Sequence, residues 1–354
     1  MMVKQNGLYS VYAFLDGYGI GVSVLTAFGL IAAICVIIFA LIWGIKYLWR
    51  GIVSMRSAAR LKAFKNEKSV GLGIVLARPV GRQGRAFGRN LHEALTEHLP
   101  GFNFRAPFRM IKLRGIAGGG TPKAMMLARR WLKRSDADMI VWGERVSGEE
   151  DGLVLYTLSR GGGLSPEGAT LEAFPLPGGQ QAWSDALRKA AAYMLAKSLQ
   201  PGLRSPEAFR PEKTKLLAEE LIAILEADPE MSPTVRAEIE ADYCAAVIHG
   251  AEKAGDMDRL DHVIALRRGH LADKDIQSNT FRLMQSRVDL GRALIARSDK
   301  VYHAADLQEA IEHLSAVVEV IRTHPTIQRA QATSDAMFKA QTMIENRKRF
   351  SQNF

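Results

Sequence analysis

The sequence predicts an α/β plus all-α protein, with one N-terminal transmembrane helix, then a small α/β domain, then a domain of helical hairpins. Three observations predict it. No charged residue occurs from Gly17 to Ile45. Strand and helix patterns alternate from about residue 69, and beyond Pro201 glycine becomes rare while Ala, Leu, Glu and Arg dominate. The expected parts are a short N-terminal segment (1–18), the transmembrane helix (19–48), a basic juxtamembrane linker (49–68), the α/β domain (69–203) and the helical-repeat domain (204–354).

Composition limits the classes of protein to consider. The chain has 354 residues, a length that suggests about two domains of ordinary size, and its formal net charge is +10. Its two cysteines, Cys35 and Cys244, are far apart, so neither a disulfide framework nor a cysteine-based metal site is expected. A chain without an expected disulfide framework fits a reducing compartment, which is the interpretation that we favour.

The apolar run is long enough to cross a bilayer. Residues 20–42 are apolar on every helical face, and a membrane span needs about 20 such residues. A helix packed on a soluble core would carry a polar stripe. Tyr18, Trp43 and Trp49 bracket the run, as interfacial aromatic residues do. A cleaved signal peptide fits worse, because the run is long and its downstream side is basic. We therefore expect residues 20–45 to contact the lipid bilayer.

Charge on the two flanks predicts the orientation. The downstream flank contains seven basic residues and one acidic residue, Glu67, whereas the upstream flank contains one basic residue, Lys4, and one acidic residue, Asp16. Because positive flanks stay in the cytoplasm, we expect a single-pass protein of the bacterial inner (cytoplasmic) membrane, with its N-terminus outside and its C-terminal domains cytoplasmic. Periplasmic placement is the alternative. The basic residues are Lys46, Arg50, Arg56, Arg60, Lys62, Lys65 and Lys68.

The expected α/β domain has the order β-α-β-α-β-β-(β)-α. Its helix at 123–135 should begin with Thr121 as N-cap and Pro122 at the first helical position. The other elements are strands at 70–77, 138–144 and 153–158, a weaker strand at 170–175, an extended piece at 102–108, and helices at 84–99 and 180–199.

One stretch of this domain carries a resemblance. Residues 128–144 read as a helix, then Ala-Asp, an apolar strand and Trp-Gly-Glu. This pattern resembles the TolB amino-terminal domain and the related FlgO-type modules of bacterial envelope and signalling proteins. The resemblance implies a helix packed on a strand that Trp-Gly ends, and a role in interaction; it brings no shared catalytic residues.

A glycine-rich loop precedes the helix at 123–135. Helix N-termini bind anions, so the loop is a candidate ligand site, formed by Gly118, Gly119, Gly120, Thr121 and Lys123. The loop is not a P-loop, because the Gly-Lys-Ser/Thr ending is missing. A turn plus a helix cap is the favoured interpretation.

Eight basic residues crowd the same half of the domain: Arg78, Arg82, Arg85, Arg89, Arg105, Arg109, Lys112 and Arg114. Together with Phe102, Phe104 and Phe108 they leave open a nucleic-acid or lipid-headgroup face. A solvated face with core aromatic residues is favoured, and nucleic acid is not expected as a partner.

Six long helices are expected after residue 205, at 213–227, 232–254, 257–271, 278–296, 304–323 and 326–349. The pair formed by Leu290–Leu294 and Leu307–Leu314 resembles a tetratricopeptide repeat, with a longer gap than the 34-residue form. The expected packing residues are Leu290, Gly291, Leu294, Ala310 and Leu314. The resemblance implies a groove that binds peptides or partner helices; the alternative is a plain bundle.

No catalytic, cofactor or metal site is expected, since the eight histidines form no His-x-x-x-His or His-Glu-x-x-His pair. The leading hypothesis is a membrane-anchored adaptor that binds unknown protein partners through residues 205–350 and the α/β domain. The alternative is a membrane-tethered sensor of a small anionic ligand or nucleotide, and an enzyme of unrecognised type is the third. The spacing of Gly17 and Gly21 leaves a homo-oligomer open.

Overall fold

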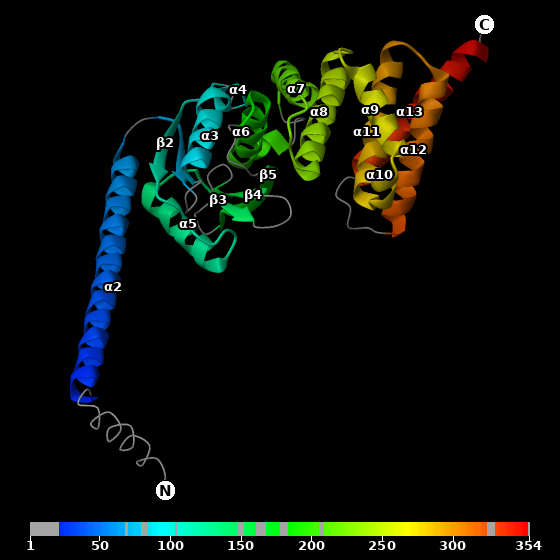
Figure 1. Cartoon of the computed structure of the whole chain (residues 1–354). Helices are drawn as coiled ribbons and strands as arrows, with labels where there is room; N and C mark the ends of the chain where they lie inside the picture. The colour runs from blue at the N-terminus through cyan, green and yellow to red at the C-terminus, as the bar shows by residue number, and fades with distance from the viewer. Residues whose placement is uncertain are drawn as a thin grey trace. The chain divides into compact units, whose positions relative to one another are not determined.

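The computed structural model describes residues 21–67, 70–78, 84–102, 105–146, 152–160, 168–177, 183–204, 209–323 and 330–352. The chain forms two compact units, residues 1–66 and residues 67–354 (Figure 1). The expected N-terminal segment 1–18 and the interfacial Tyr18 lie outside the described residues.

The first unit contains helix α2 (Gly21–Asn66), which continues through the residues expected to form a linker. Its segment Ala27–Ile45 has a mean hydropathy of 2.8, and none of its side chains is buried. Within the described part of the chain, this is the one helix long and apolar enough to cross a membrane. A signal sequence near an N-terminus meets the same criterion.

The second unit contains one five-stranded mixed sheet in the order β2-β1-β3-β4-β5. Strands β2 and β3 both run parallel to β1, whereas β4 runs antiparallel to its two neighbours, β3 and β5. The interior strand β1 is almost wholly buried, as expected for an apolar run with parallel neighbours on both sides. The strands are β1 (Leu72–Ala77), β2 (Phe108–Leu113), β3 (Met139–Val146), β4 (Gly152–Ser159) and β5 (Thr170–Pro177).

Helices cover both faces of the sheet. Helix α3 (Gly84–Glu97) leads from β1 to β2, and α5 (Pro122–Ser135) leads from β2 back to β3 on the other side of β1. Because such crossovers are right-handed, α3 and α5 lie on opposite faces. Helix α6 (Asp185–Leu199) packs beside α3 (Figure 1).

The extended piece expected at 102–108 is wrong. Leu99–Phe102 forms the short helix α4, and the strand β2 follows at Phe108–Leu113. Strand β2 lies at the sheet edge, where most of its side chains are only half-buried. Its sequence, which contains Arg109 and Lys112, therefore lacks the continuous apolar run that marks β1.

The rest of the second unit is helical. Helices α7 and α8, α11 and α12, and α12 and α13 pack as consecutive pairs. Ser232 and Asn279 cap α8 and α11 through their side chains, which is why these helices begin where they do. The short α10 was not expected. The elements are the 3-10 helix η2 (Pro201–Arg204), α7 (Pro211–Glu226), α8 (Pro233–Ala254), α9 (Leu260–Ala272), α10 (Lys274–Ser278), α11 (Thr280–Lys300), α12 (Ala304–Thr323) and α13 (Ala330–Gln352).

Candidate functional site

The glycine-rich loop forms a tight turn before α5. Gly118 and Gly119 have φ values of +93° and +49°, in the region that glycine adopts without strain. The Thr121 backbone N–H donates to the Gly118 carbonyl at 2.9 Å, and the Thr121 hydroxyl accepts from the Ala124 N–H at 3.4 Å. Thr121 is therefore the N-cap and Pro122 the first helical residue, as the sequence predicted.

Strands β3 and β4 hold this loop in place. The buried Trp142 donates from Nε1 to the Gly119 carbonyl at 2.8 Å, and the Tyr156 ring stacks on Trp142 with centroids 5.6 Å apart. A Cβ on Gly119 would overlap the Glu144 carboxylate. The Trp-Gly-Glu segment thus supplies both the anchor of the loop and an acidic group beside it.

This arrangement does not favour an anion at the loop. The Thr121 hydroxyl is already engaged by Ala124, Pro122 has no N–H, and the Glu144 carboxylate beside Gly119 repels negative charge. Gly120, Thr121 and Lys123 are exposed.

Of the three phenylalanines, the two that the structure describes do not form a platform for stacking bases. Phe102 is buried, with its ring 5.1 Å from that of Tyr193, and Phe108 is half-buried in β2. Phe104 lies outside the described residues.

The five packing residues of the repeat-like pair lie between α11 and α12. Leu290, Leu294, Ala310 and Leu314 are fully buried. A Cβ on Gly291 would lie 2.7 Å from Cγ of Leu314, so glycine is required for this close approach. These residues therefore lie at the contact between the two helices.

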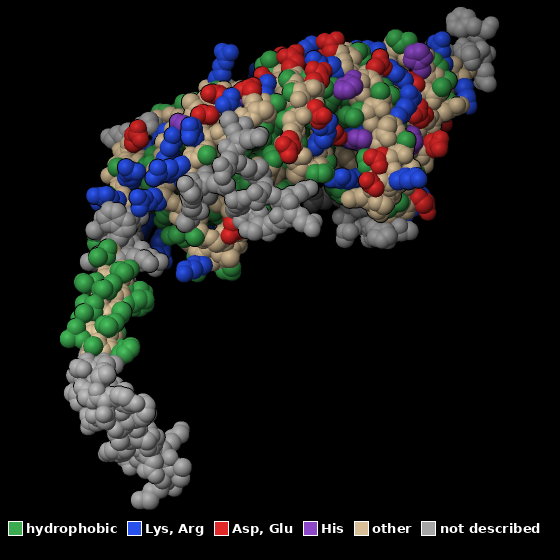
Figure 2. All heavy atoms as spheres, in the orientation of Figure 1, with side chains coloured by type: hydrophobic (Ala, Val, Ile, Leu, Met, Phe, Trp, Pro, Cys, Tyr) green, Lys and Arg blue, Asp and Glu red, His purple; other side chains and the backbone are tan. Residues whose placement is uncertain are grey.

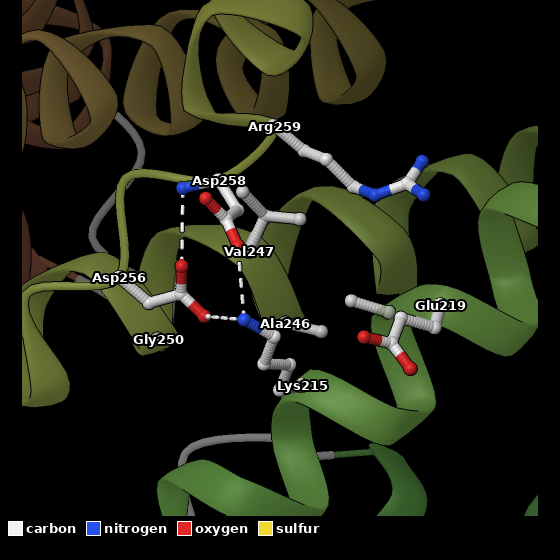
Figure 3. A pocket seen from close by; sticks show the side chains of 9 residues that line it. Lys215, Glu219, Ala246, Val247, Gly250, Asp256, Asp258 and Arg259 are labelled. Atoms are coloured by element: carbon white, nitrogen blue, oxygen red, sulfur yellow. Dashed lines mark hydrogen bonds and ion pairs between the residues drawn. The ribbon is translucent and has the colours of Figure 1, made fainter.

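A small hollow lies between α7, α8 and the turn that follows α8 (Figure 3). Its floor is apolar and contains Ala218, Ala246 and Val247. On one side, Lys215 Nζ lies 3.1 Å from Asp256 and 2.9 Å from Asp258. The hydrogen bonds that Lys215 donates to Asp258 and Asp256 raise its pKa, so Lys215 stays charged at neutral pH.

The other side of the rim carries Glu219 and Arg259 (Figure 3). Arg259 has φ +64° and lies 3.7 Å from Glu226. No ion pair engages Glu219 within the part of the chain that the structure describes. The hollow was not predicted, because its residues come from three segments that only the fold brings together.

A buried polar cluster joins α6 to α8. The Tyr193 hydroxyl donates to Asp242 at 2.8 Å, and Lys197 Nζ lies 2.6 Å from Asp242 and 2.8 Å from Glu238. Burial alone would lower the pKa of Lys197, but Asp242 and Glu238 outweigh it and raise the pKa. The cluster attaches α8 to α6 and gives the buried Asp242 Oδ2 two donors, which offsets the cost of burying that charge.

One group of residues has the spacing of metal ligands, namely Glu97, His98 and Asp185. Arg188 already supplies a cation there, 3.2 Å from Asp185 and 3.6 Å from Glu97. We find no second such group among the described residues.

The free thiol of Cys244 is not an activated nucleophile. Burial raises its pKa to about 12, so the thiol is protonated at neutral pH.

No protein-family model matches the chain, and no curated protein or solved structure matches it either.

Proposed function

We propose that the protein is a membrane-anchored adaptor, whose apolar segment Ala27–Ile45 spans the bilayer and whose helical part binds protein partners. Its mean hydropathy of 2.8 and its lack of buried side chains support the anchor. The basic residues after the span support a cytoplasmic placement of the second unit at a bacterial inner membrane.

The observation that carries partner binding is the hollow between α7 and α8. Interfaces concentrate their binding energy where an anchoring side chain enters a pocket surrounded by a polar rim. The floor of Ala218, Ala246 and Val247 accepts a small apolar side chain, and the Glu219 carboxylate on the rim attracts a basic one. We therefore propose that the partner presents a small apolar residue next to Lys or Arg.

The cluster around Asp242 fixes α8, which forms part of the hollow, against α6. A surface that is already fixed lowers the entropy that binding has to overcome. Farther along the helical part, the ion pair between Arg267 and Asp289, 2.7 Å apart and almost fully buried, joins α9 to α11.

The sensor alternative has weaker support, because Glu144 lies where the glycine loop would have to accept an anion. We expect nucleotides to leave the melting temperature unchanged. A nucleotide-dependent rise that Lys123→Glu abolishes would instead favour the sensor.

The adaptor is tested by cross-linked pull-down of the full chain from native membranes. Glu219→Lys should remove specific partners by reversing the charge on the rim. The matched control is Glu230→Lys, the same change at an exposed residue that does not line the hollow. If both variants capture the same proteins as the unchanged chain, the hollow is not a docking site.

A further inference from the structure

Charge is distributed very unevenly along the chain. Residues 46–135 contain 20 Lys and Arg but only three acidic residues, a net charge of +17. Residues 136–354 contain 26 basic and 33 acidic residues, a net charge of −7. The basic excess therefore lies entirely in the part of the chain that directly follows the apolar segment.

The acidic residues of this stretch are too few to neutralise the excess. Only two of them, Glu93 and Glu97, occur between residues 84 and 135, and Arg188 of α6 engages both, at 3.2 Å and 3.6 Å. In the described part of the chain, these two carboxylates therefore pair with an arginine from another part of the sequence.

Four of these basic residues form what we call the α3–β2 face: Arg85, Arg89, Lys112 and Arg114. All four are exposed, and in the described part of the chain none of them makes an ion pair. Arg85 and Arg89 are one helical turn apart on α3, and Lys112 and Arg114 have the same side-chain parity on and just after the edge strand β2. Figure 2 shows Lys and Arg side chains gathered over the part of the molecule that holds α3 and β2.

His92 shows that the two elements of the face are close in space. Burial lowers the pKa of this α3 side chain, the positive charge of Lys112 on β2 lowers it further, and only Glu93 of the same helix opposes them. The charges on α3 and on β2 therefore act on the same region.

Protection of a sheet edge explains only part of this face. Charged side chains on an edge strand prevent pairing with other chains, which is sufficient to account for Lys112. Arg85 and Arg89 are on a helix, where no edge needs protection.

We propose that the α3–β2 face binds anionic phospholipid headgroups of the bilayer that holds α2. The inference rests on the proposed membrane anchor. Each Lys or Arg near an anionic membrane surface contributes about 1 kcal/mol, or roughly fivefold in binding. The α3–β2 face belongs to the same polypeptide as the proposed anchor α2, which keeps the bilayer surface at a high effective concentration.

A nucleic acid suits this face less well. Phe102 is buried and cannot stack on bases, and the net charge of −7 beyond residue 135 opposes a long polyanion. A membrane surface engages only the side of the molecule that faces it.

The contact sets a requirement on the chain. Helix α2 continues for 21 residues beyond Ile45, which is about 32 Å at roughly 1.5 Å per residue. If this part of α2 left the bilayer as a straight helix, it would carry the face away from the headgroups, so the proposal requires a bend between Ile45 and β1. The experiment therefore has to measure contact between the face and the lipid directly.

The test uses the full chain in nanodiscs of phosphatidylcholine alone or with added phosphatidylglycerol. Acetylation of Lys112 is compared with that of Lys274, an exposed lysine on α10 that serves as internal control. We expect the anionic lipid to slow acetylation of Lys112 about fivefold or more and to leave Lys274 unchanged. Arg85→Glu with Arg89→Glu should abolish the protection of Lys112, since reversing two charges costs about 25-fold or more in binding. The control variant Arg282→Glu, at a partly exposed residue of α11 far along the sequence from the α3–β2 face, should retain it.

Equal acetylation of Lys112 in both kinds of nanodisc would overturn the proposal. Protection by added RNA but not by phosphatidylglycerol would overturn it in favour of a nucleic acid. Failure of the anchor is visible separately, as release of the chain by alkaline carbonate. In that case, the acetylation of Lys112 and Lys274 would be compared after adding the chain to neutral or anionic vesicles, and slower acetylation of Lys112 with anionic vesicles alone would still support the lipid contact.

Discussion

The sheet region (residues 70–204) and the helical region (residues 209–352) use their charged residues differently. In the helical region, Arg297 forms two hydrogen bonds with Asp306, at 2.7 and 2.8 Å, and Arg292 and Arg268 engage Glu252 and Glu309. On the α3–β2 face, the basic residues face solvent. Ion pairs in the helical region hold helices to one another, whereas the cations of the α3–β2 face in the sheet region are available to an external partner.

The largest expected effect is that of Asp289→Ala, which tests whether ion pairs hold the helical region together. It leaves Arg267 buried without its carboxylate, and we expect a loss of about 3–5 kcal/mol of unfolding free energy in urea denaturation. The double variant Arg267→Met with Asp289→Leu should recover most of that loss, because it leaves no buried charge. A loss below about 1 kcal/mol for Asp289→Ala would show that the pair is not structural.

Gly291→Val tests the packing of the helical region. The new side chain meets Leu314, so we expect a loss of about 1–3 kcal/mol on urea denaturation. Gly269→Ala is the matched control: its Cβ meets nothing within 4 Å, and alanine favours helix α9 by up to about 1 kcal/mol. Equal effects at the two positions would contradict the role given to Gly291.

The junction between the two regions predicts a pH dependence. The folded-state pKa values of Lys197 and Tyr193 are both above their ordinary values: Asp242 and Glu238 raise that of Lys197 against its burial, and burial with the Asp242 charge raises that of Tyr193. Their contribution is fully present below about pH 10 and is lost as pH rises through the folded values, because the unfolded chain releases its protons first. Chemical denaturation between pH 8 and pH 11 should therefore show a smaller alkaline loss in Lys197→Met. An unchanged slope would mean that Lys197 does not contribute.

The smallest expected effect is on the α3–β2 face. Arg85→Ala and Arg89→Ala should each change the unfolding free energy by less than about 0.5 kcal/mol, since both side chains are exposed and make no ion pair in the described structure. Thermal denaturation of the two variants measures this. A loss above about 1 kcal/mol would mean that these cations stabilise the fold, contrary to the comparison.

Local signals in the sequence predict features whose deciding residues are close together in the chain. Thr121 and Pro122 mark a helix start through their own backbone chemistry, and the helix begins there. Gly291 lies between leucines at helical spacing, and in the structure it faces Leu314 of α12. In both cases, the residues that decide the structure are near one another in sequence or share one helix face.

Features that depend on distant segments were missed. Strand β2 lies at a sheet edge, where Arg109 and Lys112 interrupt the apolar pattern, so its position was predicted wrongly. Arg188 reaches Glu93 across 95 residues of sequence, and Glu144 meets Gly119 from another strand. Such contacts follow from the packing of the sheet and leave no periodic signal in the chain.

The central claim is that α2 anchors the protein in a membrane. The most direct test is alkaline carbonate extraction of membranes that contain either the full chain or the second compact unit alone, residues 67–354. The account predicts that the full chain stays in the membrane pellet and that residues 67–354 are released to the supernatant. Release of the full chain would contradict the anchor, and the adaptor with it.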